Sequence, residues 1–138
     1  MLSIQISDIK DFMSHLLSKD TFDHFYFIEA SIKMGVSYQI QGRINEGFYD
    51  TSVEQTLNRE FCYWKEIRHR IFDIIKGKRL PLSCKIVLGL SKQSISYLIA
   101  HNNSSFREED IEGIYVNILY DPKNLLITTG ISYKNFSL

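Results

Sequence analysis

Hydrophobic residues recur at two different spacings along the chain, and the changes between them predict its elements. Alternation of apolar and polar residues, typical of strands, is found at residues 2–6, 24–44, 82–90, 114–120 and 125–132. Helical spacing is found at residues 8–17, 53–76 and 91–101. The resulting order is β-α-β-β, long helix, β-α-β-β. We therefore predict an α+β fold with a mainly antiparallel sheet of about six strands.

The long central helix is predicted from about Val53 to Lys76, because a single stripe of its helical wheel is apolar. That stripe contains Val53, Leu57, Phe61, Trp64, Ile67, Ile71 and Ile75. Gly77 is expected to end the helix, since glycine is common just past a helix C-terminus, and Pro81 follows it.

Two charged residues of this helix, Glu60 and Arg68, flank the apolar stripe at positions where a charge is partly buried. An unpaired buried charge is costly, so each is expected to have a partner. The alternatives are a structural ion pair with a strand or loop residue and a functional pocket.

The hairpin at residues 24–44 is expected to have one buried and one solvent-exposed face. Strict alternation assigns Tyr26, Ile28, Ala30, Ile32 and Met34 to the buried face. An interface is then predicted on the opposite face of the sheet, at Phe25, Phe27, Gln39, Gln41, Arg43 and Tyr115. Aromatic side chains among basic and amide groups can stack nucleobases, but an exposed apolar patch more often marks a protein interface. Self-association is therefore the first hypothesis for function.

The two halves that flank the long helix share the same plan, each with a glycine in its last strand, Gly42 or Gly130. An internal duplication and an ordinary alternating chain both explain this. The plan is also similar to a domain of the ring-shaped DNA-polymerase processivity clamps, an analogy that rests on element order alone. Because the chain has 138 residues, we predict a single domain over residues 1–138.

Charge is balanced overall, with 16 Lys and Arg against 16 Asp and Glu, which excludes a strongly basic nucleic-acid tail. It is nevertheless unevenly distributed, since residues 65–79 carry six cations and two carboxylates. The alternative hypothesis is that this region binds nucleic acid or a phosphate anion through Lys76, Lys78, Arg79, Lys65 and Arg70. The competing interpretation is a solvated helix with favourable cations at its C-terminus.

Catalytic and metal-binding patterns are not evident, so the sequence favours a non-enzymatic protein without a cofactor. The two cysteines, Cys62 and Cys84, form no CxxC pair, and the four histidines lie far apart. Asp20, Asp23 and His24 share one loop, but aspartate is also common in turns. An active site built from scattered residues would leave no local motif. With no apolar run of membrane-spanning length and no secretory signal, a cytoplasmic location without membrane contact is expected.

A resemblance to a known family rests on three segments: GRINEGFYD at 42–50, YWKEIRHRIFDIIKGKRLPL at 63–82 and YDPKNLLITTGISYKNFSL at 120–138. Together they resemble a family of bacterial proteins of unknown function. They contain no nucleophile elbow, phosphate loop or metal pattern. The resemblance implies a small stand-alone cytoplasmic protein and supplies no substrate or site residues.

Overall fold

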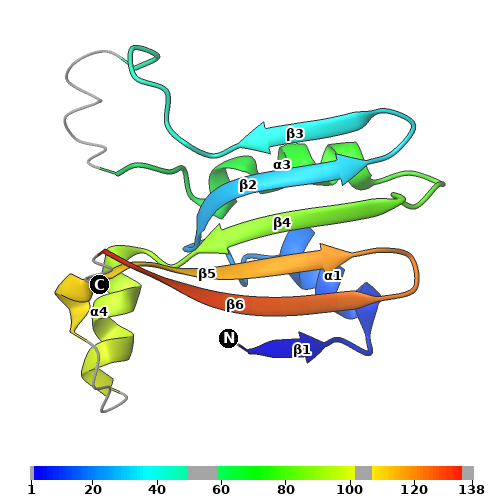
Figure 1. Cartoon of the computed structure of the whole chain (residues 1–138). Coiled ribbons are helices and arrows are strands. Elements are labelled where there is room, and N and C mark those ends of the chain that lie inside the picture. The colour runs from blue at the N-terminus through cyan, green and yellow to red at the C-terminus, as the bar shows by residue number, and fades with distance from the viewer. Residues whose placement is uncertain (1, 50–58, 102–106, 135–138) are drawn as a thin grey trace.

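The computed structural model describes residues 2–49, 59–101 and 107–134, and its elements follow the predicted order (Figure 1). The strands are β1 Ser3–Gln5, β2 Tyr26–Lys33, β3 Ser37–Gln41, β4 Ser83–Gly89, β5 Ile111–Tyr120 and β6 Leu125–Tyr133. The helices are α1 Ile9–Leu17, α3 Trp64–Ile75 and α4 Lys92–His101, with a short 3-10 turn at Glu108–Asp110. The α+β prediction with six antiparallel strands is confirmed.

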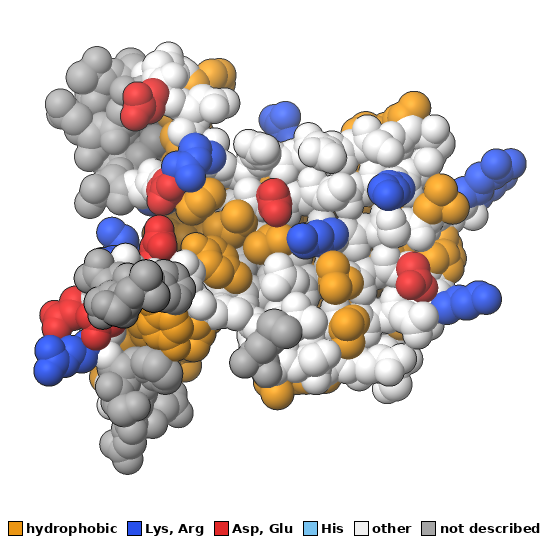
Figure 2. Space-filling view, viewed as in Figure 1, with side chains coloured by type: hydrophobic (Ala, Val, Ile, Leu, Met, Phe, Trp, Pro, Cys, Tyr) orange, Lys and Arg blue, Asp and Glu red, His pale blue; other side chains and the backbone are white. Residues whose placement is uncertain are grey.

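All six strands form one antiparallel sheet in the order β1-β6-β5-β4-β2-β3. Helices α1 and α3 both lie on one face of it, while α4 lies beyond one end (Figure 1). The other face, which we call the open face, is covered by none of the described helices and is turned toward the viewer in Figure 2. One row of register partners crosses all six strands on this face: Gln41, Glu29, Val87, Asn117, Thr128 and Ser3.

Trp64, the first residue of α3, lies at the centre of the core and is fully buried. Its indole nitrogen donates a 2.8 Å hydrogen bond to the carbonyl of Leu16 in the last turn of α1. Its ring centroid lies 5.8 Å from that of Phe27 on β2. One side chain therefore joins both helices to the sheet.

The placement of Phe27 on the exposed face was wrong. Phe27 is fully buried beside Trp64, because a β-bulge between Phe27 and Glu29 inserts one extra residue, Ile28. A bulge reverses the alternation on one side of it. Ala30 and Ile32 therefore share the core face with Phe27, whereas the register puts Tyr26 on the open face with its partner Gly89.

The long helix was also predicted wrongly at its N-terminal end, since α3 begins only at Trp64. Before it, Phe61 and Tyr63 are extended and form isolated bridges to Arg43 and Tyr26. The backbone of Cys62 accepts a 2.8 Å bond from Phe27 and donates a 2.9 Å bond to Gly42. These tertiary backbone bonds, together with β-favouring aromatic residues, outweigh the helical periodicity. Val53 and Leu57 lie outside the described residues.

Arg68 forms a structural ion pair, one of the two alternatives expected for it. Its guanidinium donates bonds of 2.8 and 3.0 Å to the two carboxylate oxygens of Asp23, in the loop before β2. Both side chains are largely buried, with 23% and 12% of their surfaces exposed. Glu60, instead of flanking a helix, pairs with Arg43 at the end of β3. The Arg68–Asp23 pair joins α3 to the loop that leads into β2.

The two halves are positioned differently, because α1 covers the sheet whereas α4 lies at its end (Figure 1). The internal duplication therefore stays one of two open alternatives. None of the described helices is long and apolar enough to cross a membrane.

Candidate functional site

A cleft of about 410 Å³ lies at the end of the sheet where β2 and β5 begin and β4 ends. We call it the Tyr115 cleft. Figure 2 shows a notch at this end, with hydrophobic side chains in its floor and both acidic and basic side chains around it. Its lining comes from β2, β4, β5, α4 and the extended segment before α3. Segments far apart in the sequence therefore converge on one hollow.

Aromatic and aliphatic side chains form the floor of the Tyr115 cleft. Tyr26, Phe61 and Tyr115 supply three rings, and Ile28, the residue added by the bulge, lies among them. The Tyr26 ring stacks on Tyr63 at 5.4 Å between centroids and lies 6.3 Å from the Phe61 ring. Stacking favours this relative orientation of the Tyr26 and Tyr63 rings.

Two strand glycines let side chains of the floor pack closely against the backbone. A Cβ at Gly113 would lie 2.5 Å from the hydroxyl oxygen of Tyr115, so the ring lies over a position that only glycine leaves free. A Cβ at Gly89 would approach Ile28 to 3.2 Å and the Tyr115 ring to 3.6 Å. Glycine inside a strand often marks such a close approach.

Two arginines line one side of the cleft, and both are already paired. Arg43 pairs with Glu60, and its guanidinium carbon lies 5.3 Å from the Phe61 ring centroid. Arg59 donates bonds of 2.7 and 3.0 Å to Glu66 and lies 4.4 Å from the centroid of Tyr63. The Arg59 pair is the better ordered of the two, because the Arg59 side chain is only 11% exposed whereas the Arg43 side chain is 63% exposed.

The opposite side carries single charges of both signs, Lys92 from α4 and Glu112 from β5. Neither has an ionic partner within the described ranges, although the Ser132 hydroxyl donates a 3.2 Å bond to Glu112. Burial raises the pKa of Tyr115, and the carboxylates of Glu112 and Glu60 raise it further. The Tyr115 hydroxyl therefore stays protonated and able to donate a hydrogen bond.

A second hollow of about 290 Å³ adjoins the cleft and shares Lys92, Ile95 and Glu112 with it. It continues toward Ile111 and Lys134. A ligand longer than the cleft would extend into this second hollow.

The Arg59–Glu66 pair makes the support of the cleft sensitive to pH. The hydrogen bonds from Arg59 are the main reason that the pKa of Glu66 lies below its usual value, and the Tyr63 amide adds a 2.6 Å bond. A carboxyl group whose pKa is lower in the folded than in the unfolded protein stabilises the fold at any pH above its unfolded pKa of about 4.3. This stabilisation is lost as the pH falls through the folded pKa.

We expect Glu66→Gln to lower the melting temperature at pH 7, by an amount that shrinks below about pH 4. Melting curves from pH 3 to 8 test this, with exposed Glu46→Gln as control. A difference that does not change with pH would contradict it.

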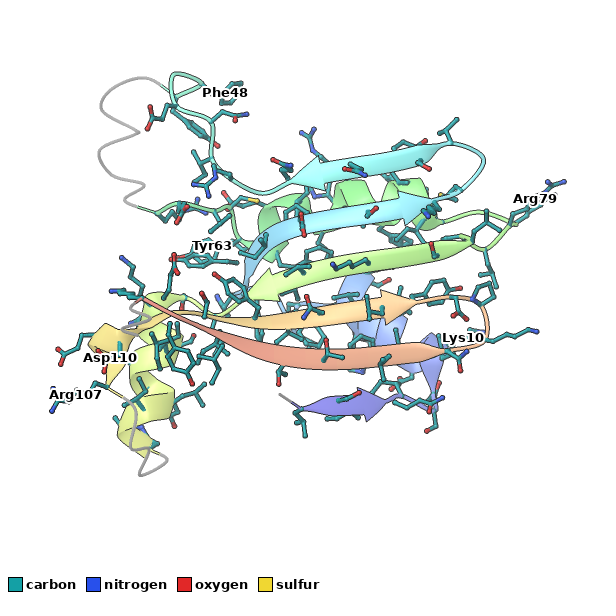
Figure 3. The ribbon with its side chains drawn as sticks, in the orientation of Figure 1. Lys10, Phe48, Tyr63, Arg79, Arg107 and Asp110 are labelled. Carbon is teal, nitrogen blue, oxygen red and sulfur yellow. The ribbon has the colours of Figure 1, made fainter. Side chains whose placement is uncertain are left out.

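The basic residues predicted to bind an anion lie along α3 and the turn after it, outside the Tyr115 cleft. Lys65 and Arg70 are exposed at separate points of α3, and Lys76 pairs with Asp73 at 3.0 Å. Arg79 projects at the opposite end of the sheet from Tyr63 (Figure 3). Lys78 is an exposed neighbour of Arg79. None of the five lines the Tyr115 cleft.

The residues predicted as an interface are divided between several places. Gln39, Gln41 and Tyr115 belong to the open face, where the register pairs them with Ser31, Glu29 and Gly89. Arg43 lines the cleft instead. Phe25 is half-buried before β2, with its ring 5.7 Å from Phe22, and Phe27 lies in the core. The predicted set is therefore not one continuous patch.

The thiols are poor candidates for nucleophiles. Burial raises the pKa of Cys62, helped by the Glu66 carboxylate, and raises the pKa of Cys84 to about 12. A thiol with a raised pKa stays protonated and reacts slowly. No group of three metal-ligating side chains occurs in the part of the chain that the structure describes, and Asp23 is engaged by Arg68.

Sequence reasoning missed most of the cleft. The alternation assigns Tyr26 and Ile28 to the core, and the helical stripe assigns Phe61 to a helix. The available signal was the pair of glycines inside strands, Gly89 and Gly113.

The comparisons with known proteins give a family but no activity. A family model described as "Family of unknown function (DUF5721)" matches residues 15–138, so the chain belongs to that family. The predicted membership of a family of unknown function is confirmed. Comparison with curated proteins and with solved structures found no match. The analogy with processivity clamps therefore stays a prediction.

Proposed function

We propose that the protein is a non-enzymatic binding module that holds a small, ring-containing ligand in the Tyr115 cleft. The observation that carries this proposal is the floor of the cleft, in which the rings of Tyr26, Phe61 and Tyr115 line a hollow and the Tyr115 ring packs closely over Gly113. Ligand pockets are usually preformed, largely apolar and supplied with a few placed polar groups.

Size and charge narrow the class of ligand. A volume of about 410 Å³ is in the ordinary range for small-molecule sites. Aromatic rings in the floor suit a flat ring that can stack on them. Lys92 and Glu112 suit a ligand with an acidic group and a basic or hydrogen-bond-donating group. Polar ring-bearing metabolites, such as nucleosides or aromatic amino acids and their dipeptides, meet these requirements.

We favour binding over catalysis because the arginines of the cleft are paired and the nearby thiol is protonated. Arg43 and Arg59 are held by carboxylates, and the Cys62 thiol behind this wall has a raised pKa. Free thiols at Cys62 and Cys84 suit a reducing compartment, so we place the protein in the cytoplasm.

A thermal-shift panel tests the proposal, using nucleosides, nucleotides, aromatic amino acids, aromatic dipeptides and a single-stranded oligonucleotide. At a ligand concentration about 100 times Kd, binding adds about 2.7 kcal/mol, which raises the melting temperature by about 5–15 °C. We expect at least one small ring compound to give such a shift and the oligonucleotide to give none.

Two variants connect any shift to the cleft. Tyr115→Ala removes one ring of the floor, and Gly113→Ala forces the Tyr115 ring from its position over the strand, so each should weaken binding at least tenfold. Tyr97→Ala is the matched control, because this exposed tyrosine of α4 lies outside the cleft. Unchanged affinity in Tyr115→Ala, or no small ligand with a Kd below about 1 mM, would overturn the proposal.

A further inference from the structure

We infer that the outer edge of β3 is a self-association surface, on which β3 of a second copy pairs in antiparallel orientation. This inference goes beyond ligand binding in the Tyr115 cleft and does not depend on it. It begins with the difference between the two edge strands of the sheet.

The two edges are protected very differently. Exposed sheet edges promote pairing between chains, and natural proteins block this with short edge strands, charges, prolines or bulges. At one edge, β1 has only three residues. At the other, β3 has five, Ser37–Gln41, with no charge, no proline and no shift in register. The β3 edge therefore lacks the usual devices against pairing.

The backbone groups of β3 that point outward can be identified from its pairing with β2. Two backbone hydrogen bonds bracket the hairpin: the Met34 amide donates to the Val36 carbonyl at 3.0 Å, and the Gly42 amide donates to the Ile28 carbonyl at 2.8 Å. In an antiparallel pair, bonded and non-bonded residues alternate, so Tyr38 and Ile40 bond to β2. The amide and carbonyl groups of Ser37, Gln39 and Gln41 then face outward. Within the described residues no strand pairs with them.

The strand is complementary to itself when a two-fold axis passes through Gln39. Gln39 then faces Gln39 of the second copy, and Ser37 faces Gln41, so all outward amide and carbonyl groups find partners. Tyr38, which is 38% exposed, faces Ile40. An aromatic residue opposite a β-branched one is a favourable cross-strand pair.

Charge on the neighbouring strand agrees with this register. In β2, Lys33 lies beside Ser37 and Glu29 lies beside Gln41. Pairing Ser37 with Gln41 therefore puts Lys33 of one copy and Glu29 of the other in one row, about 14 Å apart across three strand spacings. Opposite charges, not like charges, occupy the two ends of the interface.

The test is the mass in solution, measured by light scattering and sedimentation equilibrium. The expected result is a dimer of twice the 16.2 kDa chain mass. Gln39→Lys and Gln39→Glu each put like charges on the two-fold axis, so each alone should associate at least about tenfold more weakly. An equimolar mixture of the two should restore the dimer, because opposite charges then meet.

The mixture also excludes misfolding, since two misfolded variants would not restore each other. Ser3→Lys, which adds the same charge to the other edge strand, is the matched control and should leave the dimer intact. A monomeric wild-type protein at about 100 μM would overturn the inference. So would a dimer that Ser3→Lys dissociates and Gln39→Lys does not.

Discussion

Trp64→Ala is expected to lower the free energy of unfolding by about 3–5 kcal/mol, the usual cost of removing a buried tryptophan. The side chain is fully buried, contacts Phe27 on the sheet, and donates to the Leu16 carbonyl on α1. Its loss leaves a cavity between the two layers and an unpaired buried carbonyl. For a chain of this length, the melting temperature should fall by about 10–20 °C.

Two variants separate packing from hydrogen bonding at Trp64. Trp64→Phe keeps a ring and loses the donor, so it should cost only about 1–3 kcal/mol. Phe48→Ala, at an aromatic residue that is 80% exposed, should change stability by less than about 0.5 kcal/mol. Urea unfolding followed by tryptophan fluorescence suits Phe48→Ala, and circular dichroism suits the Trp64 variants. A loss below about 1 kcal/mol in Trp64→Ala would contradict a central role for this residue.

Arg68→Ala is the second change expected to have a large effect. It leaves the Asp23 carboxylate, only 12% exposed, without its charged partner. Breaking a buried ion pair costs about 3–5 kcal/mol, and the remaining solvent access of this pair reduces our expectation to about 2–3 kcal/mol. Arg70→Ala is the matched control, because Arg70 is exposed on the same helix.

A double-mutant cycle measures how strongly the two residues depend on each other. Since most of the cost in Arg68→Ala comes from the stranded carboxylate, Asp23→Asn in the same chain should recover at least half of it. Equal and additive losses in the two single variants would mean that the ion pair contributes little.

Much of the fold could be predicted from sequence, because most elements keep a single spacing of hydrophobic residues, helical or alternating, along their whole length. Helix α1 begins after Asp8, whose carboxylate accepts a 3.0 Å bond from the Asp11 amide, the N-cap bond that aspartate favours. Gly77, expected after the long helix, has a φ of 144°. At these points local preferences and tertiary structure agree.

The errors occurred where tertiary contacts override the local pattern. Phe61 and Tyr63 fit the helical stripe, yet the ends of β2 and β3 hold this segment in extended form. Alternation along β2 was extrapolated through Ile28, and a bulge gives no signal in a hydrophobic pattern. These two errors share one physical cause, since backbone pairing partners distant in sequence cannot be read from periodicity.

The same two features create the candidate site. The bulge turns Tyr26 away from the core and adds Ile28 to the floor of the Tyr115 cleft, while the extended segment brings Phe61 beside them. If β2 were regular and residue 61 helical, these side chains would not meet, so the two errors also prevent the cleft from being predicted. The sequence predicts that Tyr115 lies on the open face, but it does not predict that Tyr26 and Ile28 lie beside it.

A nitrogen–proton correlation spectrum, recorded while the best small ligand of the thermal-shift panel is added, tests the central claim most directly. Gly89 and Gly113 line the cleft and report on it, whereas Gly77 reports on the basic turn that contains Lys78 and Arg79. We predict that the largest shifts occur at Gly89 and Gly113, with Gly77 unchanged. Shifts confined to Gly77, Lys78 and Arg79 would contradict the assignment of the Tyr115 cleft as the functional site.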